Sequence, residues 1–175
     1  MKKITVIVSL TLLLAALVTP LAAGCGGGSQ PKQQLQDYVT ACRPNVERVN
    51  AAFADIGPVL QAISPAKDAT WAAAAEAFTT GAAASNAAAG GFKAIVPPEQ
   101  LKPTHDQLVG GLGDLGKALA IVGKALADGT FTQKLLNGIQ VGQLLDSGNK
   151  ARTAWKSALE QQCKKLGVTI PWKWQ

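Results

Sequence analysis

The sequence predicts an all-α fold, an up-down-up-down antiparallel four-helix bundle with a short extra helix between its third and fourth helices. Apolar residues recur at steps of three and four along four segments, and no segment shows the strict alternation of a β-strand. Proline, glycine and serine interrupt the pattern between these segments. The connections are short, so successive helices are expected to pack antiparallel.

The first predicted helix carries an apolar seam between residues 35 and 63. Its members are Leu35, Val39, Cys42, Val46, Val49, Phe53, Ile56, Leu60 and Ile63. Side chains at this spacing share one helix face, which must be buried against neighbouring helices. Pro44 and Pro58 lie off the seam, and the seam continues through both, so we expect kinks within one helix. Ser64-Pro65 ends this helix.

Two further seams predict the second and third helices. The second consists of Trp71, Ala75, Phe78, Ala82, Ser85, Ala89, Phe92 and Val96. The third consists of Leu101, His105, Leu108, Leu112, Leu115, Leu119, Val122 and Leu126. Pro97-Pro98 separates the two helices because proline cannot extend the helix that precedes it. Asp128-Gly129-Thr130 ends the third.

The fourth segment is less regular. Its apolar residues are Phe131, Leu135, Leu136, Leu145, Trp155, Leu159 and Leu166. Cys42 lies 21 residues before Ile63, the end of the first helix. If Cys42 and Cys163 face each other on antiparallel helices with the same rise per residue, the fourth helix starts about 21 residues before Cys163, near residue 142. Residues 131–138 then form a separate short helix that closes the end of the bundle.

The second and third helices are rich in alanine and glycine, which leaves two explanations open. Small side chains allow two helix backbones to approach closely. Alternatively, they leave a groove between these helices for a small apolar ligand or cofactor, near His105.

The N-terminus has the layout of an export signal. Lys2 and Lys3 precede an apolar stretch, Ile4 to Val18, and small residues at positions 22–24 precede Cys25. This segment resembles a bacterial lipoprotein signal with its lipobox, although Ala22 stands where the family usually has Leu. An uncleaved membrane anchor and an ordinary signal followed by a plain thiol are the alternatives.

The resemblance implies a chain organisation and an address. Residues 1–24 are the signal peptide, 25–31 a flexible tether, 32–166 the helical bundle and 167–175 a tryptophan-containing tail. Cys25 becomes the acylated N-terminus, carrying palmitate or a similar acyl chain. The protein is then held by membrane lipid at the outer face of the cell membrane, or at the outer membrane of a diderm.

The remaining two cysteines form an even pair once Cys25 is assigned to lipid. In an oxidising compartment we expect a disulfide between Cys42 and Cys163 rather than two buried thiols. Closing so long a loop would stabilise the fold by about 4–5 kcal/mol on the chain-entropy model. The pair has no C-x-x-C spacing, so we interpret it as structural.

Charge and motifs exclude several function classes. The chain has 17 Lys and Arg against 11 Asp and Glu, without the dense basic stripe of a nucleic-acid-binding protein. Residues 111–116 match G-x-G-x-x-G, but they lie inside a helical seam rather than after a strand. We predict no catalytic residues, no metal site and no cofactor, and therefore no enzyme activity.

His105 is the single histidine of the chain. One histidine cannot build a His-His or His-Cys metal cluster. We interpret it as a structural residue on the seam of the third helix, with contact to a bound ligand as the alternative.

The C-terminal tail contains Trp172, Lys173 and Trp174. Tryptophan and lysine suit the headgroup region of a bilayer, so contact with the membrane is one hypothesis. The other is that the tail folds back on the bundle. Taken together, the sequence predicts a membrane-anchored extracytoplasmic module that binds a protein partner at the cell envelope, with a carrier of a small apolar molecule as the alternative.

Overall fold

The computed structural model describes residues 29–63, 69–136 and 138–174, which contain five α-helices and no strand. The elements are α1 (Ser29–Ala62), α2 (Ala69–Lys93), the 3-10 helix η1 (Glu99–Leu101), α3 (Lys102–Asp128), α4 (Gln133–Leu136) and α5 (Ile139–Leu166). The predicted signal peptide, Cys25 and the Ser64-Pro65 break lie outside the described residues. No helix in the described ranges is long and apolar enough to cross a bilayer.

Helix α1 continues for 34 residues through both of its prolines. Pro44 and Pro58 are exposed, so their rings face solvent while the apolar face of the helix stays in contact with the core. The helix begins at Ser29, inside the segment 25–31 that the sequence predicts as a flexible tether. Residues 29–31 therefore belong to the bundle.

Two glycines end helices in the left-handed conformation that side-chain-bearing residues avoid. Gly129 follows α3 with φ 70°, and Gly167 follows α5 with φ 62°. In the residue after Gly129, the backbone amide of Thr130 donates a hydrogen bond to the carbonyl oxygen of Ala125 at 2.8 Å. Helix α2 ends at Lys93, four residues before the Pro97-Pro98 pair that precedes η1.

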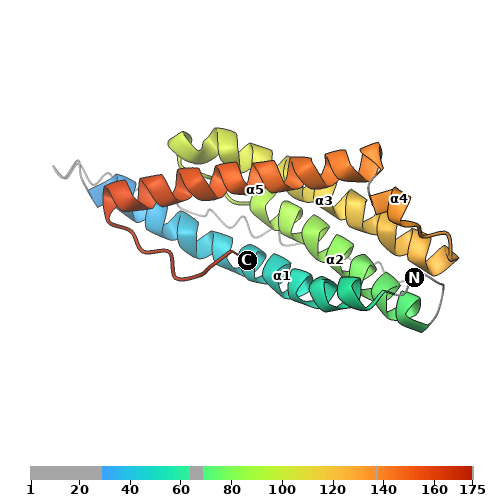
Figure 1. Cartoon of the computed structure of the whole chain (residues 1–175). Helices are drawn as coiled ribbons and strands as arrows, with labels where there is room; N and C mark the ends of the chain where they lie inside the picture. Colours follow the sequence, from blue (N-terminus) through green and yellow to red (C-terminus); the bar gives the residue numbers. More distant parts are fainter. Residues whose placement is uncertain (1–28, 64–68, 137, 175) are drawn as a thin grey trace, which may run out of the picture.

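The four long helices pack in chain order, but the ring that they form is open on one side. Helix α2 packs against α1 and α3, and α3 also packs against α5, whereas α1 and α5 touch at few positions (Figure 1). We call the end where α1 begins and α5 finishes the proximal end, and the opposite end, which carries α4, the distal end. Every residue of the predicted third seam, Leu101 to Leu126, is buried.

Glycine at the crossing of α3 and α5 lets the two backbones approach closely. A β-carbon on Gly111 would lie 2.5 Å from the β-carbon of Ala151, and one on Gly148 would lie 3.0 Å from the carbonyl oxygen of Gly111. On the other side of α3, a β-carbon on Gly123 would lie 3.3 Å from the carbonyl oxygen of Ala75 in α2. The small residues therefore act by close helix approach.

Helix α4 is a single turn at the distal end, within the predicted 131–138 segment. Helix α5 starts at Ile139, three residues before the predicted position. It ends at Leu166, where the sequence places the end of the last helix.

Adjacent substitutions in α3 are expected to have opposite effects on stability. Gly111→Ala collides with Ala151 and should lower the free energy of unfolding by about 1–3 kcal/mol. A β-carbon at position 110 would contact nothing within 4 Å. Gly110→Ala should therefore raise the free energy of unfolding by up to about 1 kcal/mol, because it removes a glycine from the helix interior. Urea unfolding measures both values, and two substitutions of equal effect would contradict the close crossing.

Candidate functional site

Residues from α1, α2, α3, α5 and the C-terminal tail meet in one aromatic cluster in the proximal half of the bundle. Its members are Tyr38, Phe92, His105, Trp155, Trp172 and Trp174. Trp155 is fully buried at its centre: its ring lies edge-on to Phe92 at 5.5 Å and to Trp174 at 5.2 Å, and parallel to Trp172 at 5.9 Å between centroids. Such ring pairs add about 0.5–1.5 kcal/mol each beyond the area they bury.

A chain of hydrogen bonds runs through the cluster. The indole nitrogen of Trp155 donates to the Tyr38 hydroxyl at 2.7 Å, and this hydroxyl lies 2.8 Å from Nδ1 of His105. Nε2 of His105 lies 3.0 Å from the carbonyl oxygen of Phe92. Because a carbonyl only accepts, Nε2 carries the proton and Nδ1 accepts from the Tyr38 hydroxyl.

Both ring nitrogens of His105 are therefore in use, and the side chain is only 3% exposed. Burial lowers the pKa of His105, which keeps the ring neutral, and the hydrogen bond to the Phe92 carbonyl opposes this shift. Burial likewise raises the pKa of Tyr38. Within the described residues, His105 thus links α1, through Tyr38, to the end of α2, through Phe92.

The C-terminal tail turns back from the end of α5 and runs along α1, on the side where α1 and α5 touch at few positions (Figure 1), and its tryptophan rings pack on Trp155 of α5. The Trp172 indole donates to the carbonyl oxygen of Val39 at 3.2 Å, and the Asn50 side-chain amide donates to the carbonyl oxygen of Lys173 at 2.6 Å. The indole nitrogen of Trp174 is buried without a hydrogen-bond acceptor among the described residues. Ring packing is therefore the main contribution of Trp174.

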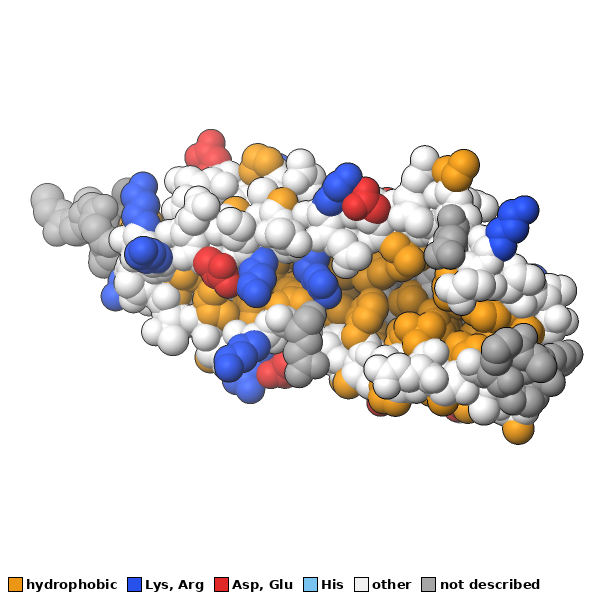
Figure 2. Space-filling view, viewed as in Figure 1, with side chains coloured by type: hydrophobic (Ala, Val, Ile, Leu, Met, Phe, Trp, Pro, Cys, Tyr) orange, Lys and Arg blue, Asp and Glu red, His pale blue; other side chains and the backbone are white. Residues whose placement is uncertain are grey.

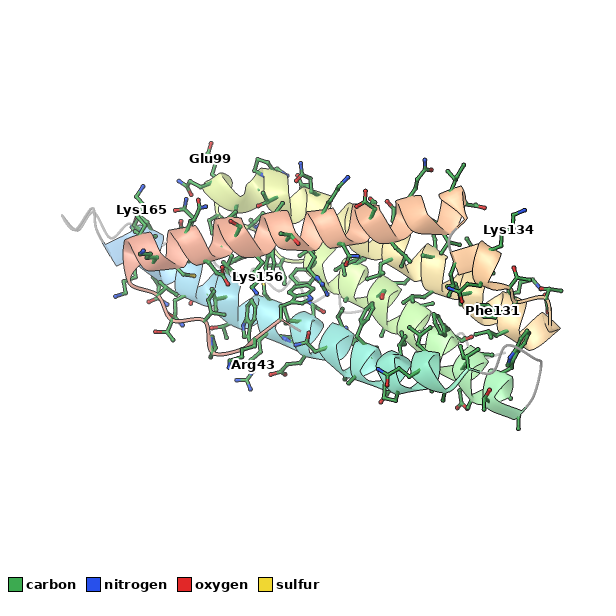
Figure 3. The ribbon with its side chains drawn as sticks, in the orientation of Figure 1. Arg43, Glu99, Phe131, Lys134, Lys156 and Lys165 are labelled. Atoms are coloured by element: carbon green, nitrogen blue, oxygen red, sulfur yellow. The ribbon has the colours of Figure 1, made fainter. Side chains whose placement is uncertain are left out.

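This arrangement favours the second of the two hypotheses for the tail. Trp174 is buried and Trp172 is half-buried, so both indoles pack on the bundle, and Lys173 between them is exposed. The tail covers the side of the bundle between α1 and α5. Figure 3 shows Lys156 of α5 beside this tail, and the two line a depression of about 330 Å³.

The predicted Cys42–Cys163 disulfide is absent, and both residues are free, buried thiols. Helices α1 and α5 run in opposite directions (Figure 1), and Leu35 of α1 lines the same depression as Gln162 and Leu166 of α5. Cys163 therefore lies near the level of Leu35. Cys42 lies seven residues farther toward the distal end, about 10 Å along the axis. A disulfide needs α-carbons within about 7 Å.

Beyond the tail, the space between α1 and α5 continues toward the distal end as a hollow in which apolar side chains gather (Figure 2). We call it the α1–α5 groove. Phe53 and Leu60 lie on the face of α1 that carries Asn50, and Leu145 lies three turns before Lys156 on the matching face of α5. Phe53 and Leu145 are partly buried against the core, and Leu60 is 42% exposed. A β-carbon on Gly57, on the same face of α1, would meet nothing within 4 Å.

Between α2 and α3, where the sequence left a ligand groove open as an alternative, the two helices approach closely at Gly116 and Gly123 of α3. A depression of about 470 Å³ does lie beside His105, at the proximal end of α2 and α3. Lys93, Val96, Lys102 and Asp106 are among its lining residues. His105 offers it no free ring nitrogen.

Metal-ligating side chains do not gather in residues 29–63, 69–136 and 138–174. No three His, Cys, Asp or Glu side chains in these ranges are placed to hold a metal ion. Burial raises the pKa of the Cys42 thiol to about 12, and burial followed by the nearby Glu160 raises that of Cys163. Both thiols are therefore protonated near neutral pH, and a protonated thiol is a poor nucleophile.

Comparison with known proteins identifies no relative. No protein-family model matches the chain, no curated protein matches it in sequence, and no solved structure matches its fold.

Sequence patterns alone do not single out Tyr38 and Asn50, which make the polar contacts of this region. Both lie next to seam residues, Val39 and Val49, but outside the seam itself; Tyr38 is nevertheless buried, and Asn50 is half-buried. The one available signal is that Tyr38 is the single tyrosine of the chain. A buried tyrosine usually requires a partner for its hydroxyl.

Thiol chemistry tests the corrected assignment of the cysteines. In the folded protein, Cys42 and Cys163 should resist alkylation, because both are buried and protonated. In urea without a reductant, both should be alkylated, and peptide mass spectrometry identifies each site separately. Recovery of the two peptides joined by a disulfide would contradict the structure.

Proposed function

We propose that this protein is a membrane-anchored, extracytoplasmic helical module that binds a protein partner through the α1–α5 groove. In this proposal the domain is an up-down-up-down four-helix bundle whose fourth side is closed by the tail in its proximal half. The distal half is left open for the partner. The protein has no catalytic activity of its own.

The open side of the bundle is the observation that carries the proposal. A helix with an apolar seam normally buries it against neighbours on both sides. The α1 seam is buried from Leu35 to Val49, where the tail is present, and at Ile56, but the other distal seam residues keep exposed area: Phe53, Leu60 and Ile63. A contiguous apolar surface of this kind is typical of a binding site for another molecule.

The tail indicates what kind of segment the groove accepts. Trp172 and Trp174 place aromatic rings between α1 and α5. Two hydrogen bonds join the tail to α1: the Trp172 indole donates to a backbone carbonyl of α1, and the Asn50 side chain donates to a backbone carbonyl of the tail. A partner segment with apolar side chains at similar spacing could pack in the same way in the distal half of the α1–α5 groove. The buried area that it adds would come mainly from Phe53, Leu60 and Leu145.

The anchor in this proposal is Cys25. The lipobox-like signal supports acylation of this residue, only four positions before the start of α1 at Ser29. Four extended residues span at most about 14 Å, so the bundle would be held against the membrane surface.

Acylation has a direct test in the native host. The wild-type protein should fractionate with membranes, and its N-terminal peptide should begin at Cys25 with the added mass of acyl chains. Cys25→Ser should lose both properties. Cys42→Ser is the matched control, because this thiol is buried in the core, and it should stay with the membrane. An unmodified Cys25 in the wild-type protein would contradict the anchor.

Binding of anilinonaphthalene sulfonate, a dye that fluoresces in apolar sites, tests the groove. Phe53→Glu places a charge in the groove wall and should lower dye fluorescence about threefold or more. Ala87→Glu adds the same charge at an exposed position of α2 and should leave it unchanged. Circular dichroism confirms that both variants are folded. Equal fluorescence of the two variants would exclude the groove as the apolar binding surface.

A further inference from the structure

Helix α2 ends well inside the length of α1. A β-carbon on Gly91, near the end of α2, would collide with the Asn45 side chain in the middle of α1, so the two helices are in close contact there. About four turns of α1 precede Asn45 on the proximal side of this contact. Along these turns, the connection between α2 and α3, residues 94–98, takes the place of α2 beside α1.

Val96 does not lie on the buried helix face where the sequence places it, at the end of the second apolar seam. Helix α2 ends three residues earlier, at Lys93. Pro97 explains the difference, because a residue that precedes proline disfavours the helical conformation. Val96 therefore leaves the helix face. It is 89% exposed, the largest exposed fraction of any large apolar side chain in the described residues.

Val96 belongs to a continuous apolar surface and is not an isolated exposed residue. It lines a depression of about 710 Å³ between α1 and the connection. Most of the residues that line this depression are apolar: Tyr38 and Ala41 of α1, and Ala94, Ile95, Val96, Pro97 and Pro98 of the connection. The two prolines fix their own φ angles, so this surface has little backbone entropy to lose when it binds another molecule.

The charged side chains at this depression are acidic. Asp37 of α1 and Glu99 of η1 line it, and both are exposed. The Glu99 side chain projects away from the helices (Figure 3). Neither carboxylate forms an ion pair with another described residue. Asp37 accepts a hydrogen bond from the neutral side-chain amide of Gln33 at 2.8 Å.

The basic side chains of the proximal half are engaged in other contacts or line other depressions. Arg43 and Lys102 are each paired with a carboxylate on their own helix. Lys93 and Lys165 line separate depressions, toward α3 and toward α5. The amino group of Lys32 lies beside Gly167, where α5 ends. Within the described residues, the negative charge of the 710 Å³ depression is therefore not matched by an ion pair.

We propose that this depression binds an extended segment of another protein that carries a lysine or arginine close to an apolar residue. We call it the Val96 surface, formed by Val96, Ile95, Pro97, Asp37 and Glu99. The apolar residue of the segment packs on the connection, and its basic side chain reaches the two carboxylates. Like charges repel across an interface, so the surface selects a basic segment and rejects an acidic one.

The Val96 surface is independent of the α1–α5 groove and of the anchor at Cys25. Asp37 lies about 140° around the axis of α1 from Asn50, which contacts the tail beside the groove. The two surfaces therefore occupy different sides of α1, and two partners can be bound at the same time. Failure of one proposal leaves the other standing.

Site-specific photo-cross-linking in the native host tests the Val96 surface. The photoreactive residue p-benzoylphenylalanine replaces Val96 in the full chain. In a control variant it replaces Ile139, which is 79% exposed at the distal end. After illumination, mass spectrometry identifies the cross-linked peptide, so the chemistry of the bound segment is read directly.

Position 96 should give at least about threefold more cross-linked protein than position 139. The segment attached there should contain a lysine or arginine within about three residues of the cross-link, a span of about 10 Å in an extended chain. A yield at 96 no higher than at 139 would overturn the proposal. So would attachment to an acidic segment, to lipid or to a second copy of this chain.

Neutralising the two carboxylates tests the role of charge. Asp37→Asn with Glu99→Gln should lower the yield at position 96 about threefold or more, because the attraction to the basic side chain is lost. Asp55→Asn with Glu76→Gln is the matched control: both residues are exposed in the distal half, and the yield should stay the same. Circular dichroism confirms that both double variants are folded. Equal yields from the two double variants would exclude recognition by charge.

Discussion

The indole of Trp155 is the contact on which the proximal half of the structure depends. It is fully buried, it packs against Phe92, Trp172 and Trp174, and it donates a hydrogen bond to Tyr38. One side chain thus connects α5 with α1, α2 and the tail. Helices α1 and α5 hardly touch each other directly, so this residue and the tail that packs on it provide most of the contact between them.

The sequence predicts the helices because helix formation depends on residues close together in the chain. Seam spacing and the breakers between seams identify the four long helices, and the seam of α3 is buried along its whole length. Gly129 and Gly167 end helices because glycine alone readily adopts the left-handed backbone conformation found there. The α1 seam also predicts the buried face correctly up to Val49, but not how much of its distal part is covered.

The site depends on contacts between residues far apart in the chain, which periodicity does not encode. The described part of the tail, residues 167–174, has irregular backbone, and nothing in its composition distinguishes packing on the bundle from contact with lipid. The disulfide prediction was wrong for a related reason. It assumed that Cys42 and Cys163 lie at equal height on adjacent helices, whereas the contacts at the proximal end place Cys163 near the level of Leu35.

The two buried thiols have a consequence for how this chain reaches its native state. A bundle held by a disulfide must await an oxidant, and it can be trapped by mispaired cysteines. Here the core closes by apolar packing and hydrogen bonds, and both sulfur atoms remain shielded within it. Because this structure needs no disulfide, we expect it to form in a reducing as well as in an oxidising medium.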